Sequence, residues 1–235
     1  MANLPQDLAL TVRRVLKSPG PLPVHDLRVA IRRFNQAIGL NSQNRNKTER
    51  HQSKEIMLRA GDVRNLDITL KLVAKLKETK GLQSRLRRRR DAAAKHLMEP
   101  LKAWNLPDKL PEATPAHAKQ AAVRAIQRLF KRGAEAHHPK DLHRVRIAAK
   151  KLRYTLELVA PHHPGIEQIK PLQSDLGRIN DYATARAILK PESGADAVRE
   201  QLKDKQRRKI RAFRKSSART WGDPAVARSW IQQLR

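Results

Sequence analysis

Apolar and polar residues nowhere alternate along this chain in the way that is typical of a β-strand. Ala, Leu, Lys, Arg, Gln and Glu dominate instead, and all of them favour helices. Together with Gly, Asn and Pro as stop signals, the pattern predicts an all-α protein. In the first half we expect helices over residues 7–17, 24–38, 63–80 and 82–104, with Asp62 as the N-cap of the third. A further helix is expected to start after Asn46 and to break near Gly61.

A proline-rich segment separates two groups of predicted helices. Residues 106–115 contain three prolines, which favours a linker between a first half, residues 1–105, and a second half, residues 116–235. In the second half we expect helices over residues 116–132, 141–159, 166–177, 180–189 and 195–213. The tail, residues 221–235, has no clear counterpart in the first half. We interpret residues 1–235 as a single duplicated domain.

One motif occurs in both halves. It reads H-x-x-R-x-x-x-[KR]-[KR]-[FL] from His25 to Phe34, and it returns 118 residues later from His143 to Leu152. Gly61 and Gly177 follow the two histidines after 36 and 34 residues, so the similarity extends beyond the motif. An internal repeat of this size indicates the duplication of half a domain.

Both copies of the motif predict a helix with a basic face and an opposite apolar face. With 100° between successive residues, the cations three and seven positions after each histidine share its side of the helix. Cations so close together repel one another, and an anion that neutralises them removes this cost. Arginine makes forked contacts to phosphate oxygens, whereas lysine acts as a point charge. A histidine among cations is expected to be neutral until a phosphate group binds.

The charge of the whole chain points in the same direction. Lys and Arg number 51 against 22 Asp and Glu, giving a formal net charge of +29 that the two halves share about equally. Such an excess favours a polyanion as partner. Only eight residues are aromatic, so few side chains are available for stacking on bases, and a ligand with phosphates but no bases fits best.

Other classes of protein receive little support from the sequence. The absence of cysteine excludes disulfides and thiolate metal sites. No apolar run approaches the ~20 residues that span a bilayer, and the N-terminus does not resemble a signal peptide, so we expect no membrane insertion and a cytoplasmic protein. No phosphate-binding G-x-x-x-x-G-K-[ST] loop occurs, and the carboxylates do not cluster near the motifs. We therefore expect no catalytic residue, no metal and no cofactor.

Simpler interpretations of the same residues stay open. A basic helical face is often only a solvated surface, although its recurrence at matched positions argues against this. Either histidine can serve in capping or packing. The run Arg87–Arg90 spreads around all faces of a helix, and at best Arg85 and Arg89 share the ligand side. His137, His138, His162 and His163 flank prolines and are expected to lie in loops.

The paired motif resembles that of the CHAD domain, the conserved histidine α-helical domain. Gly61-Asp62-Val63-Arg64-Asn65-Leu66-Asp67 is similar to the G-x-x-R-D-x-D segment of that family, with Asn65 where an Asp is usual. Leu176-Gly177-Arg178-Ile179-Asn180-Asp181 resembles its second-half equivalent. The resemblance implies two four-helix bundles related by internal duplication and a pseudo-twofold axis. It also implies non-enzymatic binding of inorganic polyphosphate along a basic surface, and association with polyphosphate granules.

The basic positions of the family correspond to nine residues of this chain: His25, Arg28, Arg32, Arg33, His143, Arg146, Lys150, Lys151 and Arg153. Six further cations are expected to add to the surface: Arg13, Lys54, Arg64, Arg85, Arg89 and Arg128. Weak, non-specific binding of nucleic acid is the main alternative, since duplex binding needs only cations on a suitable footprint. A phosphohydrolase and a histidine metal site are the remaining alternatives. Some relatives are fused to a triphosphate-processing domain with an E-x-E-x-K motif, which does not occur here.

Overall fold

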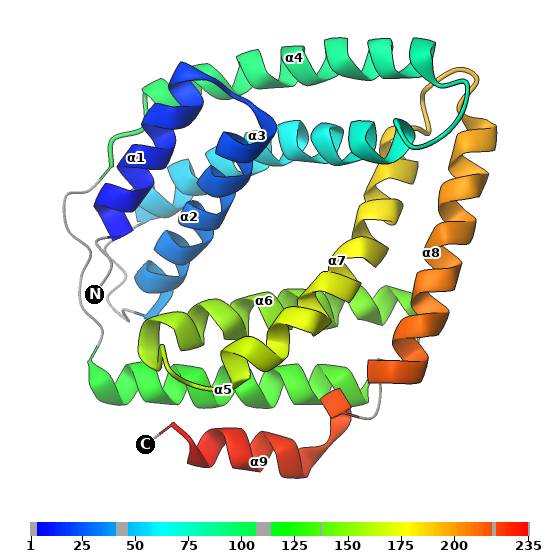
Figure 1. The fold of residues 1–235 in the computed structure, drawn as a ribbon. Coiled ribbons are helices and arrows are strands. Elements are labelled where there is room, and N and C mark those ends of the chain that lie inside the picture. Colours follow the sequence, from blue (N-terminus) through cyan, green and yellow to red (C-terminus); the bar gives the residue numbers. More distant parts are fainter. Residues whose placement is uncertain (1–3, 41–46, 107–113, 137, 218–219, 235) are drawn as a thin grey trace. The chain divides into compact units, whose positions relative to one another are not determined.

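The computed structural model describes residues 4–40, 47–106, 114–136, 138–217 and 220–234. These residues form α-helices, one short 3₁₀ helix and turns, and no strand occurs among them, which confirms the all-α prediction (Figure 1). The helices are α1 Leu4–Lys17, α2 Pro21–Leu40, α3 Lys47–Val73, α4 Lys80–Lys102, α5 Pro115–Ala134, α6 Pro139–Val159, α7 Gly165–Ile188, α8 Asp196–Ser217, η1 Thr220–Gly222 and α9 Pro224–Gln232.

The chain divides into two compact units. The first contains residues 1–112 and 184–202, and the second contains residues 113–183 and 203–235. Helices α7 and α8 therefore each contribute residues to both units. Most of the predicted linker, residues 107–113, lies outside the described residues.

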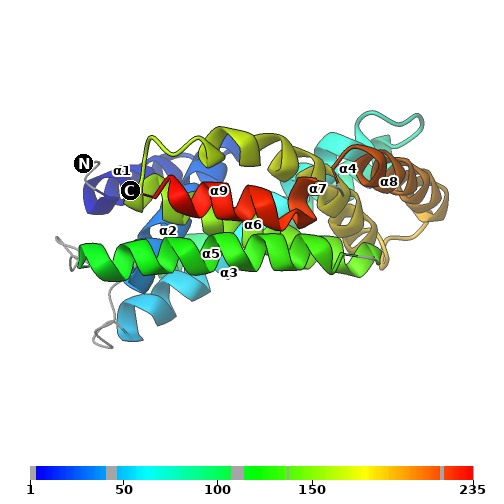
Figure 2. The same cartoon turned by 90° about the horizontal axis from the view of Figure 1, so that it is seen from below.

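Each unit buries its own apolar core. In the first unit α1 packs on α2, α2 on α3 and α3 on α4, around a core that includes Phe34 and Trp104. In the second unit α5 packs on α6, and the core includes Phe130, Trp221 and Trp230. The C-terminal tail completes this second core, because α9 lies alongside α5 (Figure 2).

Several helices begin where the sequence supplies a cap or a proline. Proline suits the first helical position, since its missing N–H has no partner there in any helix. The Thr114 hydroxyl accepts the backbone N–H of His117 just before Pro115 begins α5. The Asp223 carboxylate likewise accepts the N–H of Ala225 at 2.8 Å before α9.

The two helix breaks predicted near glycine are wrong. Helix α3 runs without interruption from Lys47 to Val73, so Asp62 is an interior residue and not an N-cap. Helix α7 likewise runs through Gly177. A glycine costs a helix only about 1 kcal/mol relative to alanine, and the tertiary packing of long helices outweighs this. The real interruption lies between α3 and α4 at residues 74–79, which places Gly81 inside α4.

His163 has a larger role than the loop position predicted for it. The residue does lie in the turn between α6 and α7, but its side chain is buried. Its Nδ1 accepts the backbone N–H of Gly165 at 3.0 Å, and its Nε2 lies 2.9 Å from the Trp230 carbonyl oxygen. These contacts assign the proton to Nε2 and connect the α6–α7 turn to α9. Of the other predicted loop histidines, His138 is the N-cap of α6, and His137 lies outside the described residues.

Candidate functional site

Helix α2 has the two faces that the motif predicts. Its apolar side chains Val24, Leu27, Ile31, Phe34 and Ile38 are almost fully buried in the core of the first unit. The four cationic or titratable positions, His25, Arg28, Arg32 and Arg33, are half-buried. The burial of one face thus leaves the basic face of α2 accessible to solvent.

Arg28 connects the motif to the glycine segment on α3. Its Nη1 donates a hydrogen bond to the Met57 carbonyl oxygen at 2.7 Å. A Cβ atom placed on Gly61 would lie only 2.8 Å from the same nitrogen. Gly61 therefore leaves room for the Arg28 guanidinium against α3, which accounts for a glycine in the middle of a continuous helix.

His25 lies in the positive field of three predicted site residues. Burial lowers the pKa of its imidazole, and the charge of Arg64 lowers it further, followed by those of Arg32 and Arg28. Asp26 opposes this shift, but its carboxylate also pairs with Arg14 at 3.2 Å. Arg64 on α3 is thereby brought close to the basic face of α2, as expected for a residue that adds to the same surface.

Helix α6 repeats this amphipathic arrangement in the second unit. Val145, Leu152 and Leu156 are buried in the core. On the opposite side His143 and Lys151 are exposed, and Arg146, Lys150 and Arg153 are half-buried.

The contacts of the second histidine differ from those of the first. Nδ1 of His143 lies 3.2 Å from the Asn180 amide oxygen of α7. Asn180 follows Gly177 by three residues, just as Arg64 follows Gly61. The two motif histidines thus have different neighbours at corresponding positions. His25 lies near a cation, Arg64, and His143 lies near an amide, Asn180.

Lys151 belongs to a group of cations shared by α5 and α6. Although the residue is exposed as a whole, partial desolvation of its ammonium group lowers the pKa of Lys151, and the charges of Arg128 and Arg124 lower it further. Arg128 was expected to add to the basic surface, and it does lie near Lys151. Arg124, one turn earlier on α5, was missed, although its i,i+4 spacing from Arg128 is visible in the sequence.

Not every predicted residue is freely available to a ligand. Nε of Arg153 donates to Glu157 at 2.7 Å, and its Nη1 donates to Gln173 at 3.1 Å. Arg85 and Arg89 both bind the Glu192 carboxylate, at 3.0 and 2.6 Å. Any anion that contacts these three arginines has to compete with existing partners.

The remaining predicted cations, Arg13 and Lys54, are exposed on α1 and α3. Lys54 lines a hollow of about 590 Å³ together with Arg28, His51 and Gly61. Two carboxylates, Glu55 and Asp62, line it as well, so the hollow holds groups of both charges.

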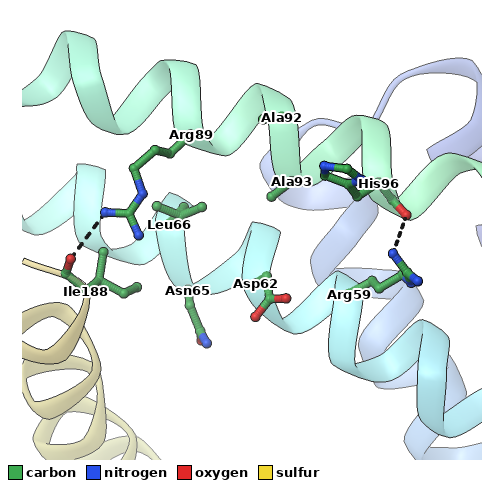
Figure 3. A pocket seen from close by; sticks show the side chains of 9 residues that line it. All are labelled: Arg59, Asp62, Asn65, Leu66, Arg89, Ala92, Ala93, His96 and Ile188. Carbon is green, nitrogen blue, oxygen red and sulfur yellow. Dashed lines mark hydrogen bonds between the residues drawn. The ribbon is translucent and has the colours of Figure 1, made fainter. Parts of the chain in front are cut away.

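A second hollow, of about 540 Å³, lies between α3 and α4 (Figure 3). Two arginines at its edges are fixed to backbone carbonyl groups: Arg59 donates to His96 at 3.2 Å and Arg89 donates to Ile188 at 3.3 Å. Both are also neutralised, because Arg59 pairs with Glu55 and Arg89 with Glu192. Because both arginines already have carbonyl and carboxylate partners, we interpret them as residues that stabilise the first unit and not as ligand contacts.

Among the described residues, no group of three or more His, Asp or Glu side chains is arranged to hold a metal ion. None of the described helices combines the length and the apolar character needed to cross a bilayer.

The sequence model of the CHAD domain matches residues 6–190. The chain belongs to the CHAD family. The crystal structure of the CHAD domain from the plant Ricinus communis is similar to this CHAD protein, with a TM-score of 0.65 and 19% sequence identity over 99% of this chain and 89% of the plant chain. At this identity the similarity concerns the fold alone. No curated protein matches the chain in sequence.

Proposed function

We propose that this CHAD protein binds inorganic polyphosphate, without catalysing a reaction, along the basic faces of α2 and α6. The observation that supports this most directly is the duplicated amphipathic helix. In both units the apolar face is buried in the core, and the face with the motif cations is left at the surface. Cations that recur at matched positions on two helices suit a ligand that repeats a negative charge along its length.

We further propose that α1–α4 and the helices from α5 onward descend from one duplicated four-helix bundle. The repeated motif and the recurring order of helices support this, and the pseudo-twofold relation between the halves stays a prediction. Association with polyphosphate granules in the cytoplasm would follow from such binding.

Binding to nucleic acid is the second candidate, because non-specific duplex binding also needs only cations. The eight aromatic residues argue against base recognition. Seven of them are at most 9% exposed, and only Tyr182 is half-buried. Because stacking platforms for unpaired bases are nearly absent, nucleic acid could be held only through its phosphates.

Three variants that each remove two positive charges test the proposed site. Arg32→Gln/Arg64→Gln alters the surface of the first unit, and Arg128→Gln/Lys151→Gln alters that of the second. The matched control is Arg87→Gln/Arg88→Gln, since both side chains are exposed on α4 outside the motif. Arg90 is unsuitable as a control, because it pairs with the buried Asp67 at 3.0 Å and also donates to the Pro19 carbonyl oxygen.

Each of the two surface variants should bind long-chain polyphosphate about tenfold more weakly, since two charge-assisted contacts are worth at least ~1.4 kcal/mol together. The control should change the dissociation constant by less than about twofold. Equal losses in all three variants would mean that net charge, and not a defined surface, drives binding. In competition, polyphosphate should displace duplex DNA, whereas DNA should displace polyphosphate poorly. Release of orthophosphate during the titration would contradict a non-enzymatic role.

A further inference from the structure

We propose that the C-terminal part of α8 is a second contact surface for polyphosphate, separate from the duplicated motif; this inference rests on the proposed function above. We call this surface the α8 basic row and define it by five exposed residues: Arg207, Arg208, Arg211, Arg214 and Lys215. They belong to no repeated motif, and all of them lie in the second unit.

The α8 basic row is one face of an amphipathic helix. At 100° per residue its five members fall within about 120° of the helix circumference. Phe213 lies on the opposite side, is 6% exposed and belongs to the core of the second unit. Ile210, at the edge of the row, is half-buried and packs against the same core. Core packing therefore fixes the rotation of α8 and directs the cations to solvent.

The row is accompanied by a hollow of about 510 Å³ in the second unit. Arg207, Arg208 and Arg211 line it together with Ile210, Asp204 and Pro139, the first residue of α6. The partial positive charge at the N-terminus of α6 adds to the potential there. Two carboxylates oppose it: Asp204 lies 3.7 Å from Arg207, and Asp141, in the first turn of α6, accepts the His138 N–H at 2.9 Å. Three arginines line the hollow against one carboxylate, Asp204, while Asp141 is outside the lining and also lies 3.6 Å from Arg144. The net charge around the hollow is therefore positive.

The density of charge favours a polyphosphate chain over a nucleic acid. Six cations lie within residues 207–215, which span about 12 Å of helix: the five exposed members of the row and the half-buried Lys209. In polyphosphate a single bridging oxygen separates charged phosphoryl groups, whereas in DNA the charges of one strand are about 3.4 Å apart along the axis and a sugar separates them. The arginine-lined hollow suits a thin, flexible chain of phosphates that can follow its surface. No aromatic ring is exposed on α8 to stack on a base.

The test compares two variants that each remove three positive charges. Arg207→Gln/Arg208→Gln/Arg211→Gln alters the α8 basic row, and Arg87→Gln/Arg88→Gln/Lys95→Gln removes exposed charges from α4. Both are expected to keep the helical content and melting temperature of the wild type, which circular dichroism checks. The ligands are long-chain polyphosphate, tripolyphosphate and a DNA duplex, each titrated at several salt concentrations.

We expect the α8 variant to lose about tenfold or more in affinity for long-chain polyphosphate, and the control to lose less than about twofold. The slope of log affinity against log salt should also become shallower by about two, because each lost phosphate contact removes roughly 0.7–0.9 from it. When the α8 variant is combined with Arg32→Gln/Arg64→Gln, the fold losses in polyphosphate affinity of the two variants should multiply, as expected for two separate contact surfaces.

The outcomes separate the two proposals. If the wild type does not bind polyphosphate, the proposed function is wrong and this inference falls with it. If the wild type binds and the α8 variant matches the control, only the second surface is refuted. A loss of DNA affinity with unchanged polyphosphate affinity would make the α8 basic row a nucleic-acid surface and would also overturn the inference.

Discussion

Gly61 and Arg28 are in such close contact that a single methyl group on Gly61 would lie 2.8 Å from Nη1 of Arg28. The arginine belongs to the repeated motif and the glycine to the segment that follows it in the sequence. Their contact explains why the two sequence features occur together. The space left by the missing side chain lets the guanidinium reach the Met57 carbonyl oxygen on α3.

Alanine at the two corresponding glycines should have opposite effects. No atom lies within 4 Å of a Cβ placed on Gly177, so Gly177→Ala should raise the free energy of unfolding by about 0.5–1 kcal/mol through helix propensity alone. Gly61→Ala gains the same propensity but must displace the bonded Arg28 guanidinium, at an overpacking cost of about 1–3 kcal/mol. Urea unfolding of both variants checks this. Equal stabilisation by the two changes would show that Arg28 does not need the space.

Glu192 is expected to hold the connection between α7 and α8 against α4. Its side chain is 9% exposed and accepts hydrogen bonds from Nε of Arg85 and Nη1 of Arg89. Because the two arginines remain about 40% exposed, we expect Glu192→Gln to lower the free energy of unfolding by about 1–3 kcal/mol and no more. Glu99→Gln is the control, since the Glu99–Lys102 pair is largely exposed and should contribute less than about 0.5 kcal/mol.

Acid should remove the difference between wild type and Glu192→Gln. Burial raises the pKa of Glu192, but the hydrogen bonds and charges of Arg89 and Arg85 outweigh this and lower it overall. A carboxylate with a lowered folded-state pKa stabilises the protein above its unfolded pKa of about 4.3, and this contribution is lost as the pH falls through the folded value. Unfolding curves at neutral pH and below about pH 4 measure the loss. A constant difference across this range would contradict the ion-pair interpretation.

The faces of the helices were predictable from the sequence because they depend on spacing alone. The burial of Leu27, Ile31 and Phe34 opposite Arg28 follows from 3.6 residues per turn and needs no tertiary information. The same holds for Val145 and Leu152 on α6.

The partners of the site residues were not predictable, because they come from distant positions in the chain. Glu192 lies more than 100 residues from Arg85, and Asn180 lies 37 residues from His143. Gly61 was interpreted as a helix break, since the sequence gives no sign that Arg28 approaches it. The charges of the α8 basic row are visible in the sequence, but their exposure follows from the packing of Phe213 in the core, which the sequence alone does not give.

His25 should make polyphosphate binding depend on pH. Burial and the charges of Arg64, Arg32 and Arg28 lower the pKa of its imidazole in spite of Asp26, so the ring is neutral at pH 7. A bound polyanion raises this pKa, and the complex therefore takes up a proton. Affinity should rise as the pH falls from about 8 to about 6, and His25→Gln should flatten the dependence.

The stability of the free protein should change with pH in the opposite sense. A histidine whose pKa is lowered on folding binds fewer protons in the folded state, so its contribution to stability is lost as the pH falls through about 6.5. His25→Gln should make the melting temperature of the free protein less sensitive to pH between about 8 and 6. Unchanged pH profiles in this variant, for both melting and affinity, would show that His25 does not titrate in this range.

Polyphosphate should stabilise the folded protein against heat. Folding concentrates a formal charge of +29, and self-repulsion opposes the compact state. A ligand that binds only the folded form adds about 2.7 kcal/mol at 100 times its dissociation constant, and each kcal/mol raises the melting temperature by roughly 2–4 °C in a protein of this size. Saturating long-chain polyphosphate should thus raise the melting temperature by about 5–10 °C. Polyphosphate that binds the equally basic unfolded chain reduces this rise.

Orthophosphate at the same phosphorus concentration should raise the melting temperature much less, because each ion neutralises only a few cations at a time. Equal stabilisation by orthophosphate and polymer would contradict a surface that follows an extended chain of phosphates.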